Sequence, residues 1–238
     1  MIINLAHFES WLISPYMILM ILSILVGVTY IAHKVKAENK VPASYIAYMT
    51  YLNATCIVIT GITFGIIINF PNWKEGLGFT SIGGALGLAI AALVNSSIFK
   101  EVKTTIIKQS IAITSIMYNI SKLGCMLAGC CKGIEIKSNV LKPLLITYIK
   151  DNKTTESNLI NIQLIESITF FIVFIIFQLK INISNSTKIV IMAVSKFLLD
   201  FLRYTHAERL FKLTKNQVLC ILIVILAILL KNKIDVKD

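Results

Sequence analysis

Long apolar stretches alternate with short polar segments along this chain of 238 residues. A helix needs about 20 apolar residues to cross a hydrocarbon layer of ~30 Å, and seven stretches reach or approach that length. They are 12–32, 43–70, 79–99, 105–127, 162–179, 188–202 and 218–230. The pattern predicts an all-α polytopic membrane protein, with residues 1–238 forming a single domain of seven transmembrane helices. A longer polar segment, 132–161, is expected to be an outer loop.

The composition agrees with this prediction. Hydrophobic residues make up 56% of the chain and charged residues 15%, with a mean hydropathy of +0.79, whereas soluble domains average ~45–50% and ~25%. These values exclude a soluble enzyme, a nucleic-acid-binding domain and a disordered protein. No polar block is large enough to be a membrane-anchored globular domain. The net charge of +11 therefore favours attraction to anionic lipid headgroups rather than to nucleic acid.

The distribution of lysines predicts the orientation, because short cytoplasmic loops carry an excess of Lys and Arg. One side of the predicted bundle collects Lys34, Lys36, Lys40, Lys100, Lys103, Lys108, Lys180, Lys188, Lys231, Lys233 and Lys237. Among the short loops of the other side only Lys74 is basic, so we expect the N-terminus outside and the C-terminus in the cytoplasm. The outer segments 132–153 and 203–215 are basic against this rule. A negative headgroup bound near the second, shorter segment would explain its charge.

Polar and charged side chains inside spans are costly and often mark function. Seven such residues occupy three spans: Asn119 and Lys122, then Gln163 and Glu166, then Lys196, Asp200 and Arg203. The last three share one helical face. Simpler interpretations stay open: a local ion pair for Lys196 and Asp200, snorkelling for Lys122, and solvation for the other pair. All seven are expected toward the outer ends of their spans, where one cavity could gather them.

Glycines and cysteines supply weaker signals. The third span begins with Gly83-Gly84-Ala85-Leu86-Gly87, a spacing that by itself is typical of close helix packing. The five cysteines are Cys56, Cys125, Cys130, Cys131 and Cys220. The spacing Cys-x4-Cys-Cys fits no common zinc pattern, so no metal is expected, although Cys130 and Cys131 could form a disulfide or a reactive thiol pair. His7, His33 and His206 show no ligand pattern, and no cofactor is predicted.

Taken in order, these segments resemble one family. Gly83–Gly87 opens the third span, and the stretch Lys-Leu-Gly-Cys-Met-Leu-Ala-Gly-Cys-Cys-Lys-Gly, 122–133, closes the fourth. Gln163-Leu-Ile-Glu166 opens the fifth, Lys196-Phe-Leu-Leu-Asp-Phe-Leu-Arg203 lies in the sixth, and Gln217 opens the last. The set is similar to that of prolipoprotein diacylglyceryl transferases, from about residue 14 to 230. The glycine-rich stretch 122–133 is its most specific part.

The resemblance implies a seven-span enzyme of the bacterial plasma membrane that takes its diacylglyceryl group from phosphatidylglycerol. The acceptor is the lipobox cysteine thiol of a prolipoprotein, so no cysteine of this chain needs to react. Lys122, Lys196 and Arg203 would hold the lipid phosphate with Gly83 and Gly84. Glu166 and Asp200 would orient these cations or accept a proton. The supporting residues would be Asn119, Gly124, Cys125, Gly129 and Gln163.

The sequence also departs from the family pattern. Lys122 and Lys196 occupy positions where the family usually has Arg, and Asp200 stands where Glu is common. Both lysines keep the positive charge but lose the planar fork that binds two phosphate oxygens. A divergent member is therefore expected. The alternatives are a catalytically degenerate member that binds anionic lipid or lipoprotein, and a membrane thiol oxidoreductase that uses Cys130 and Cys131.

Overall fold

The computed structural model describes residues 2–4, 14–38, 41–68, 79–136, 142–150, 153–179, 183–204 and 213–235. Its long helices are α2 (Pro15–Glu38), α3 (Ala43–Ile68), α4 (Ser81–Ile98), α5 (Lys103–Leu127), α6 (Ile162–Gln178), α7 (Asn185–Leu199) and α8 (Lys215–Leu229). Short helical turns are η2 (Lys100–Val102), η3 (Lys142–Leu144), η4 (Asp200–Leu202) and α9 (Lys231–Ile234). Each long helix overlaps one of the predicted apolar stretches.

The chain is predominantly helical, as predicted, and three helices are long and apolar enough to cross a membrane. These are α2, α3 and α4, while α6 and α8 are shorter apolar helices. The number of spans and the orientation of the termini stay predictions. Several residues used for the orientation lie outside the described part of the chain, and so do two of the histidines: Lys40, Lys74, Lys180, Arg209, Lys237, His7 and His206.

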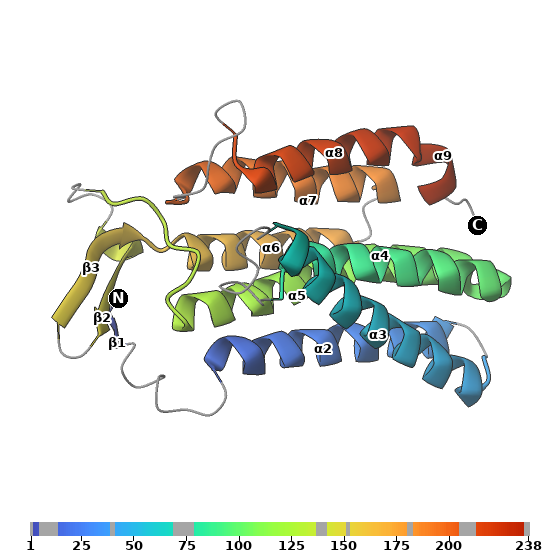
Figure 1. The fold of residues 1–238 in the computed structure, drawn as a ribbon. Helices are drawn as coiled ribbons and strands as arrows, with labels where there is room; N and C mark the ends of the chain where they lie inside the picture. The colour runs from blue at the N-terminus through green and yellow to red at the C-terminus, as the bar shows by residue number, and fades with distance from the viewer. Residues whose placement is uncertain are drawn as a thin grey trace.

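Helix α5 occupies the centre of the bundle. It contacts α2, α4, α6 and α7, while α3 packs on α4 and α8 packs on α7. Figure 1 shows α2 and α3 along one side of the bundle and α7 and α8 along the other. Ile31, Ile57, Leu88 and Ile106 are almost fully buried where α2 to α5 meet. The residues on α5 can therefore reach most of the other helices.

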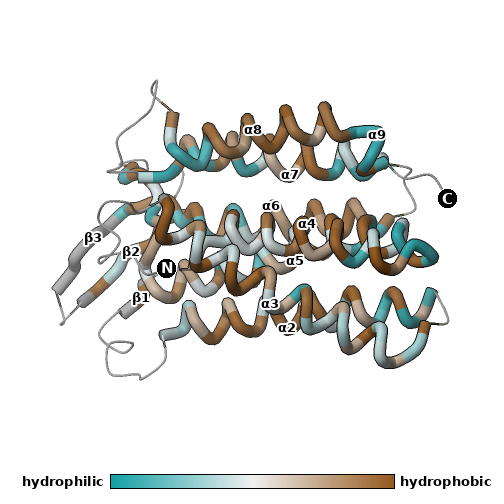
Figure 2. The backbone as a smooth tube through the Cα atoms, turned by 45° about the vertical axis from the view of Figure 1, so that its right-hand side comes forward, coloured by the Kyte–Doolittle hydropathy of each residue, from teal (hydrophilic) through white to brown (hydrophobic). Residues whose placement is uncertain are grey.

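The outward faces of the helices are apolar. Large exposed hydrophobic side chains occur on all the long helices except α5, for example Tyr51, Ile59, Leu198 and Leu229. Hydrophobic residues run along much of each helix in Figure 2. A soluble monomer rarely exposes apolar patches of this extent, whereas a lipid environment accommodates them.

Part of the segment that the sequence analysis interpreted only as a polar loop is a small sheet. Strand β2 (Leu145–Lys150) pairs in parallel with β1 (Ile2–Asn4) and antiparallel with β3 (Lys153–Ile160). Two residues of this sheet, Ile146 and Tyr148, are almost fully buried where the sheet packs against the end of α5. The strands span 3, 6 and 8 residues, too few for a hydropathy pattern to reveal. The sheet lies at one end of the helix bundle (Figure 1).

The sheet fixes the start of α6. Asn161 follows β3 directly, and its side chain accepts a hydrogen bond from the Leu164 amide at 3.2 Å, which caps the helix. Gly133 forms an antiparallel bridge with Arg203. A side chain at this glycine would clash with the carbonyl oxygen of Ile160. The ends of α5, α6 and η4 are thereby held together at the sheet end of the bundle.

Candidate active site

Five charged side chains from three parts of the chain form one ion-pair network. Lys122 Nζ lies 3.0 Å from Glu166 Oε2, and Lys196 Nζ lies 2.5 Å from Glu166 Oε1. Lys196 also lies 3.2 Å from Asp200 Oδ1, which Arg203 Nη1 approaches at 3.3 Å. Positive and negative groups alternate along the network. All five were expected from the sequence to lie near one another, and the structure brings them together.

The network is buried. Glu166 is 0% exposed, Lys122 and Asp200 are 2% exposed, and Lys196 is 6% exposed. Solvation of Glu166 and snorkelling of Lys122, both left open above, do not describe this arrangement. Buried ions are costly unless they are paired. The three cations and two carboxylates leave one positive charge unmatched within the network, so it suits a ligand that carries one negative charge.

Asp200 is held by the start of α8. The Thr214 hydroxyl donates a hydrogen bond to Asp200 Oδ2 and accepts one from the Gln217 amide at 3.1 Å. Gln217 Oε1 in turn accepts from the Thr214 amide at 2.9 Å, which completes a capping box. Such reciprocal caps satisfy two free amide groups of a helix start. Gln217 therefore has a structural role: it orients Thr214, the residue that binds Asp200.

Tyr118 lies among the cations and was not identified from the sequence. Its ring centroid is 5.0 Å from Lys122 Nζ and 5.9 Å from Lys196 Nζ, within the range of cation–π attraction. The hydroxyl is buried and has no hydrogen-bond partner among the described residues. The available signal was its helical spacing, since Tyr118 precedes Lys122 by one turn.

The predicted supporting residues hold the helices around the network. Asn119 Nδ2 donates to the Ser167 carbonyl at 2.9 Å and joins α5 to α6. Gln163 Nε2 donates to the Cys130 carbonyl at 2.7 Å and to the Tyr148 hydroxyl at 3.1 Å. Gly124 packs against α2, where an added Cβ would lie 3.2 Å from Leu19 Cβ. These contacts hold the neighbouring helices and the turn after α5 in place around the network.

Gly83 and Gly84 lie where α4 packs on α3. A Cβ at Gly83 would be 2.7 Å from the Thr60 carbonyl oxygen, and one at Gly84 would be 2.7 Å from the Phe79 ring. Close packing therefore accounts for both glycines. Gly84 also lines a small cavity of about 40 Å³ together with Tyr118 and Ser121.

A larger apolar cavity of about 310 Å³ extends from the network between α4, α5, α7 and α8. Lys196 and Tyr118 contribute to its wall, and nearly all its other lining residues are apolar. They include Ala85, Ala89, Met192, Ala193 and Ile223. A ligand with a negative headgroup and a hydrocarbon chain would match both parts of this arrangement.

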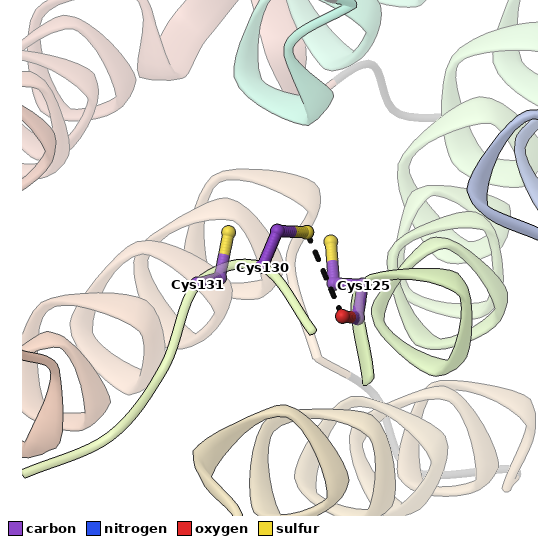
Figure 3. Close-up of side chains that lie close together, drawn as sticks. All are labelled: Cys125, Cys130 and Cys131. Atoms are coloured by element: carbon purple, nitrogen blue, oxygen red, sulfur yellow. Dashed lines mark hydrogen bonds between the residues drawn. The ribbon is translucent and has the colours of Figure 1, made fainter. Parts of the chain in front are cut away.

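Three thiols lie together at the end of α5, one on its last turn and two just after it, as Figure 3 shows. The Sγ atoms of Cys125, Cys130 and Cys131 are all within 4.8 Å of one another. Hydrogen bonds from the other two thiols hold the pKa of Cys131 well below its ordinary value. From the sequence, only Cys130 and Cys131 were expected to form a thiol pair, and Cys125 was expected to be a supporting residue.

The order of these segments agrees with one known family. The family model of prolipoprotein diacylglyceryl transferase matches residues 4–231, nearly the whole chain. The chain belongs to this family. A search of curated proteins gave no match. Prolipoprotein diacylglyceryl transferases are membrane-embedded transferases that modify prolipoproteins with a diacylglyceryl group, so the buried ion-pair network lies in a transferase scaffold.

Proposed function

We propose that this protein transfers the diacylglyceryl group of phosphatidylglycerol to the lipobox cysteine thiol of bacterial prolipoproteins. The observation that carries the proposal is the buried network with one unmatched positive charge, placed at the end of an apolar cavity. The phosphodiester of phosphatidylglycerol carries one negative charge, and its acyl chains are apolar. The lipid thus complements both the network and the cavity.

Lys122, Lys196 and Arg203 would bind the phosphate and stabilise the charge that develops as glycerol phosphate leaves. Fixed cations in a site without bulk water are effective at this task. The Tyr118 ring lies beside two of these cations. Its hydroxyl has no partner among the described residues, so it could donate a hydrogen bond to a phosphate oxygen. Two donors on separate lysines, with a phenol between them, would replace the bidentate contacts that arginines provide.

Glu166 would act as the residue that positions both lysines. Its two oxygens face Lys122 and Lys196 at 3.0 and 2.5 Å, and a carboxylate between two ammonium groups is a poor proton acceptor. Asp200 is engaged in the same way by Lys196, Arg203 and Thr214. Neither carboxylate is arranged as the base that removes the proton of the acceptor thiol.

An in vitro transfer assay tests the proposed function. The purified chain is given phosphatidylglycerol and a lipobox peptide, and mass spectrometry follows a diacylglyceryl adduct on the peptide. Wild-type protein should form the adduct, and Lys122→Ala and Lys196→Ala should lower the rate at least a hundredfold. Lys122→Arg and Lys196→Arg should retain activity because they keep the charge.

Lys188→Ala is the matched control for Lys196→Ala. Lys188 is another buried lysine of α7, with 4% exposure, but it lies near Phe177 and away from the network. Its substitution should leave transfer intact. If the wild-type protein forms no adduct while another diacylglyceryl transferase does so in the same mixture, the transferase proposal is wrong. Phosphatidylglycerol binding without transfer would then identify a degenerate lipid-binding member.

The proposal includes seven spans in the bacterial plasma membrane, with the N-terminus outside and the C-terminus in the cytoplasm. The positive residues Lys231 and Lys233 of α9 fit a cytoplasmic end. A reporter protein that is active only in the cytoplasm, fused after residue 238, should be active. An inactive fusion that is stably produced would contradict the orientation.

A further inference from the structure

The three clustered thiols are not used by the function proposed above. Cys125, Cys130 and Cys131 have their Sγ atoms within 4.8 Å of one another. In Figure 3 the Cys130 sulfur points toward the carbonyl oxygen of Cys125, and the Cys131 sulfur lies on the other side of Cys130. The chain's other cysteines, Cys56 and Cys220, lie on α3 and α8. The grouping therefore has a local cause.

That cause is the way in which α5 ends. The Cys130 amide donates to the Cys125 carbonyl at 3.1 Å and the Gly129 amide to the Met126 carbonyl at 3.3 Å, while Gly129 has φ 66°. These are the hydrogen bonds of a Schellman motif, which folds the chain after the helix back onto the last helical turn. In this chain the motif places Cys130 next to Cys125.

The third thiol comes from a second left-handed residue. Cys131 has φ 57°, a conformation that residues with a side chain adopt rarely. The turn is tied on both sides, because Gln163 binds the Cys130 carbonyl and Gly133 pairs with Arg203. Ligand spacing counted along the chain matches no common zinc pattern, but this turn brings the third sulfur back to the other two.

Three adjacent thiols suit a thiophilic d¹⁰ cation. Thiolate ligands select Zn²⁺ and Cu⁺ among common metals, and a Zn–S bond of about 2.3 Å places two tetrahedral ligands roughly 3.8 Å apart. The three Sγ atoms already lie within 4.8 Å of one another, so each pair would have to approach by at most about 1 Å.

We propose that Cys125, Cys130 and Cys131 bind one Zn²⁺ ion through three thiolates and leave its fourth position to the acceptor thiol. Within the described residues the group offers three donors, and three protein ligands with one open position are typical of catalytic zinc. The second half of the proposal rests on the proposed function. The ion-pair network offers no base that removes the proton of the acceptor thiol. Coordination to zinc would accomplish this step, since a thiol that coordinates zinc loses its proton outright.

The reaction balances without an oxidant. The acceptor thiol binds as a thiolate and its proton passes to water. The sulfur electron pair then forms the new C–S bond to the glyceryl carbon, while the bond from that carbon to the phosphate oxygen breaks. Glycerol phosphate leaves with the electron pair of the broken bond, beside the cations of the network.

Cobalt binding tests the metal site directly. The full chain, purified in detergent, reduced and freed of metal, is titrated with Co²⁺, whose thiolate complexes show charge-transfer absorption in the near ultraviolet. One equivalent should produce these bands, and one equivalent of Zn²⁺ should remove them. Cys125→Ser, Cys130→Ser and Cys131→Ser should each weaken binding at least tenfold, whereas Cys56→Ser and Cys220→Ser should not. Thermal unfolding of the metal-free variants shows that each one is folded.

Two results would overturn the metal site. One is a Co²⁺ spectrum that none of the three substitutions changes, which would mean adventitious binding. The other result has two parts. The reduced protein shows no thiolate bands with Co²⁺, and the protein before reduction has a mass two hydrogens lower because two thiols of the cluster form a disulfide. That outcome would instead favour a redox function for these thiols.

The open position is tested with the acceptor. A lipobox peptide added to the Co²⁺ protein should alter the absorption bands, and the same peptide with Ser in place of Cys should not. Identical spectra would contradict thiol binding at the metal. Transfer at the full rate by the metal-free protein would also contradict it, yet would leave the proposed transferase function intact, so the two proposals fail separately.

Discussion

Lys122 on α5 and Glu166 on α6 form an ion pair of 3.0 Å in which both side chains are almost completely buried. The other oxygen of the same carboxylate binds Lys196 on α7. One carboxylate therefore fixes both lysines of the network. Its position in the second turn of α6 is set by the Asn161 cap that follows β3, so the small sheet contributes to the geometry of the network.

Substitution of Glu166 by Gln should destabilise the protein and abolish transfer. It leaves two buried ammonium groups without their shared partner, and loss of one member of a buried ion pair costs about 3–5 kcal/mol. Thermal unfolding in detergent should show a clear fall in Tm, whereas Glu101→Gln at an exposed position should not. Addition of Lys196→Met to Glu166→Gln should restore part of the stability. An unchanged Tm for Glu166→Gln would show that the pair does not stabilise the fold.

Tyr118→Phe should weaken the use of phosphatidylglycerol without loss of stability. The hydroxyl has no partner within the described protein, so its removal breaks no internal hydrogen bond. A hydrogen bond to a charged group contributes about 1.5–3 kcal/mol, which predicts a KM for the lipid at least tenfold higher. Tyr30→Phe is the control, because that hydroxyl binds Gln109 elsewhere on α5. Equal KM values for Tyr118→Phe and wild type would remove the tyrosine from the lipid site.

Thr214→Ala should destabilise the start of α8 and release Asp200. An N-cap replaced by Ala typically costs ~1 kcal/mol, and here the same hydroxyl also donates to Asp200 Oδ2. We expect a lower Tm together with a lower transfer rate. Thr214→Ser keeps the hydroxyl and should behave like wild type. If Thr214→Ala lowers Tm but leaves the transfer rate unchanged, the hydrogen bond to Asp200 stabilises α8 and has no effect on transfer.

Much of the helical architecture could be predicted from hydropathy, because every long helix except α5 presents large apolar side chains outward. The charged network could also be predicted, since Lys196, Asp200 and Arg203 share a helical face and their cost in an apolar span marks them. Tyr118 and Thr214 could not be found in this way. An aromatic residue in an apolar helix looks like core packing, and a threonine beside a helix start looks like an ordinary cap.

The sheet and the thiol cluster depend on contacts between segments far apart in sequence or on backbone conformation. Strand β1 pairs with β2 across more than a hundred residues, and no local pattern encodes that partner. The cysteines meet through the left-handed residues Gly129 and Cys131. A left-handed conformation could be expected from the sequence at Gly129, because it is a glycine, but not at Cys131. The same limit applies to Gly83 and Gly84, whose place between α3 and α4 requires the packing partner to be known.

The apolar cavity predicts a dependence on the acyl chain that one substitution can test. Ala89 lines the cavity but is exposed, so Ala89→Phe places a ring in the cavity without a clash in the core. We expect transfer from long-chain phosphatidylglycerol to slow several-fold, while transfer from a short-chain analogue changes little, because only long chains reach the ring. Ile90→Phe alters the neighbouring exposed residue, which does not line the cavity, and should preserve the wild-type chain preference. Equal slowing of long-chain and short-chain lipids by Ala89→Phe would place the acyl chains elsewhere in the bundle.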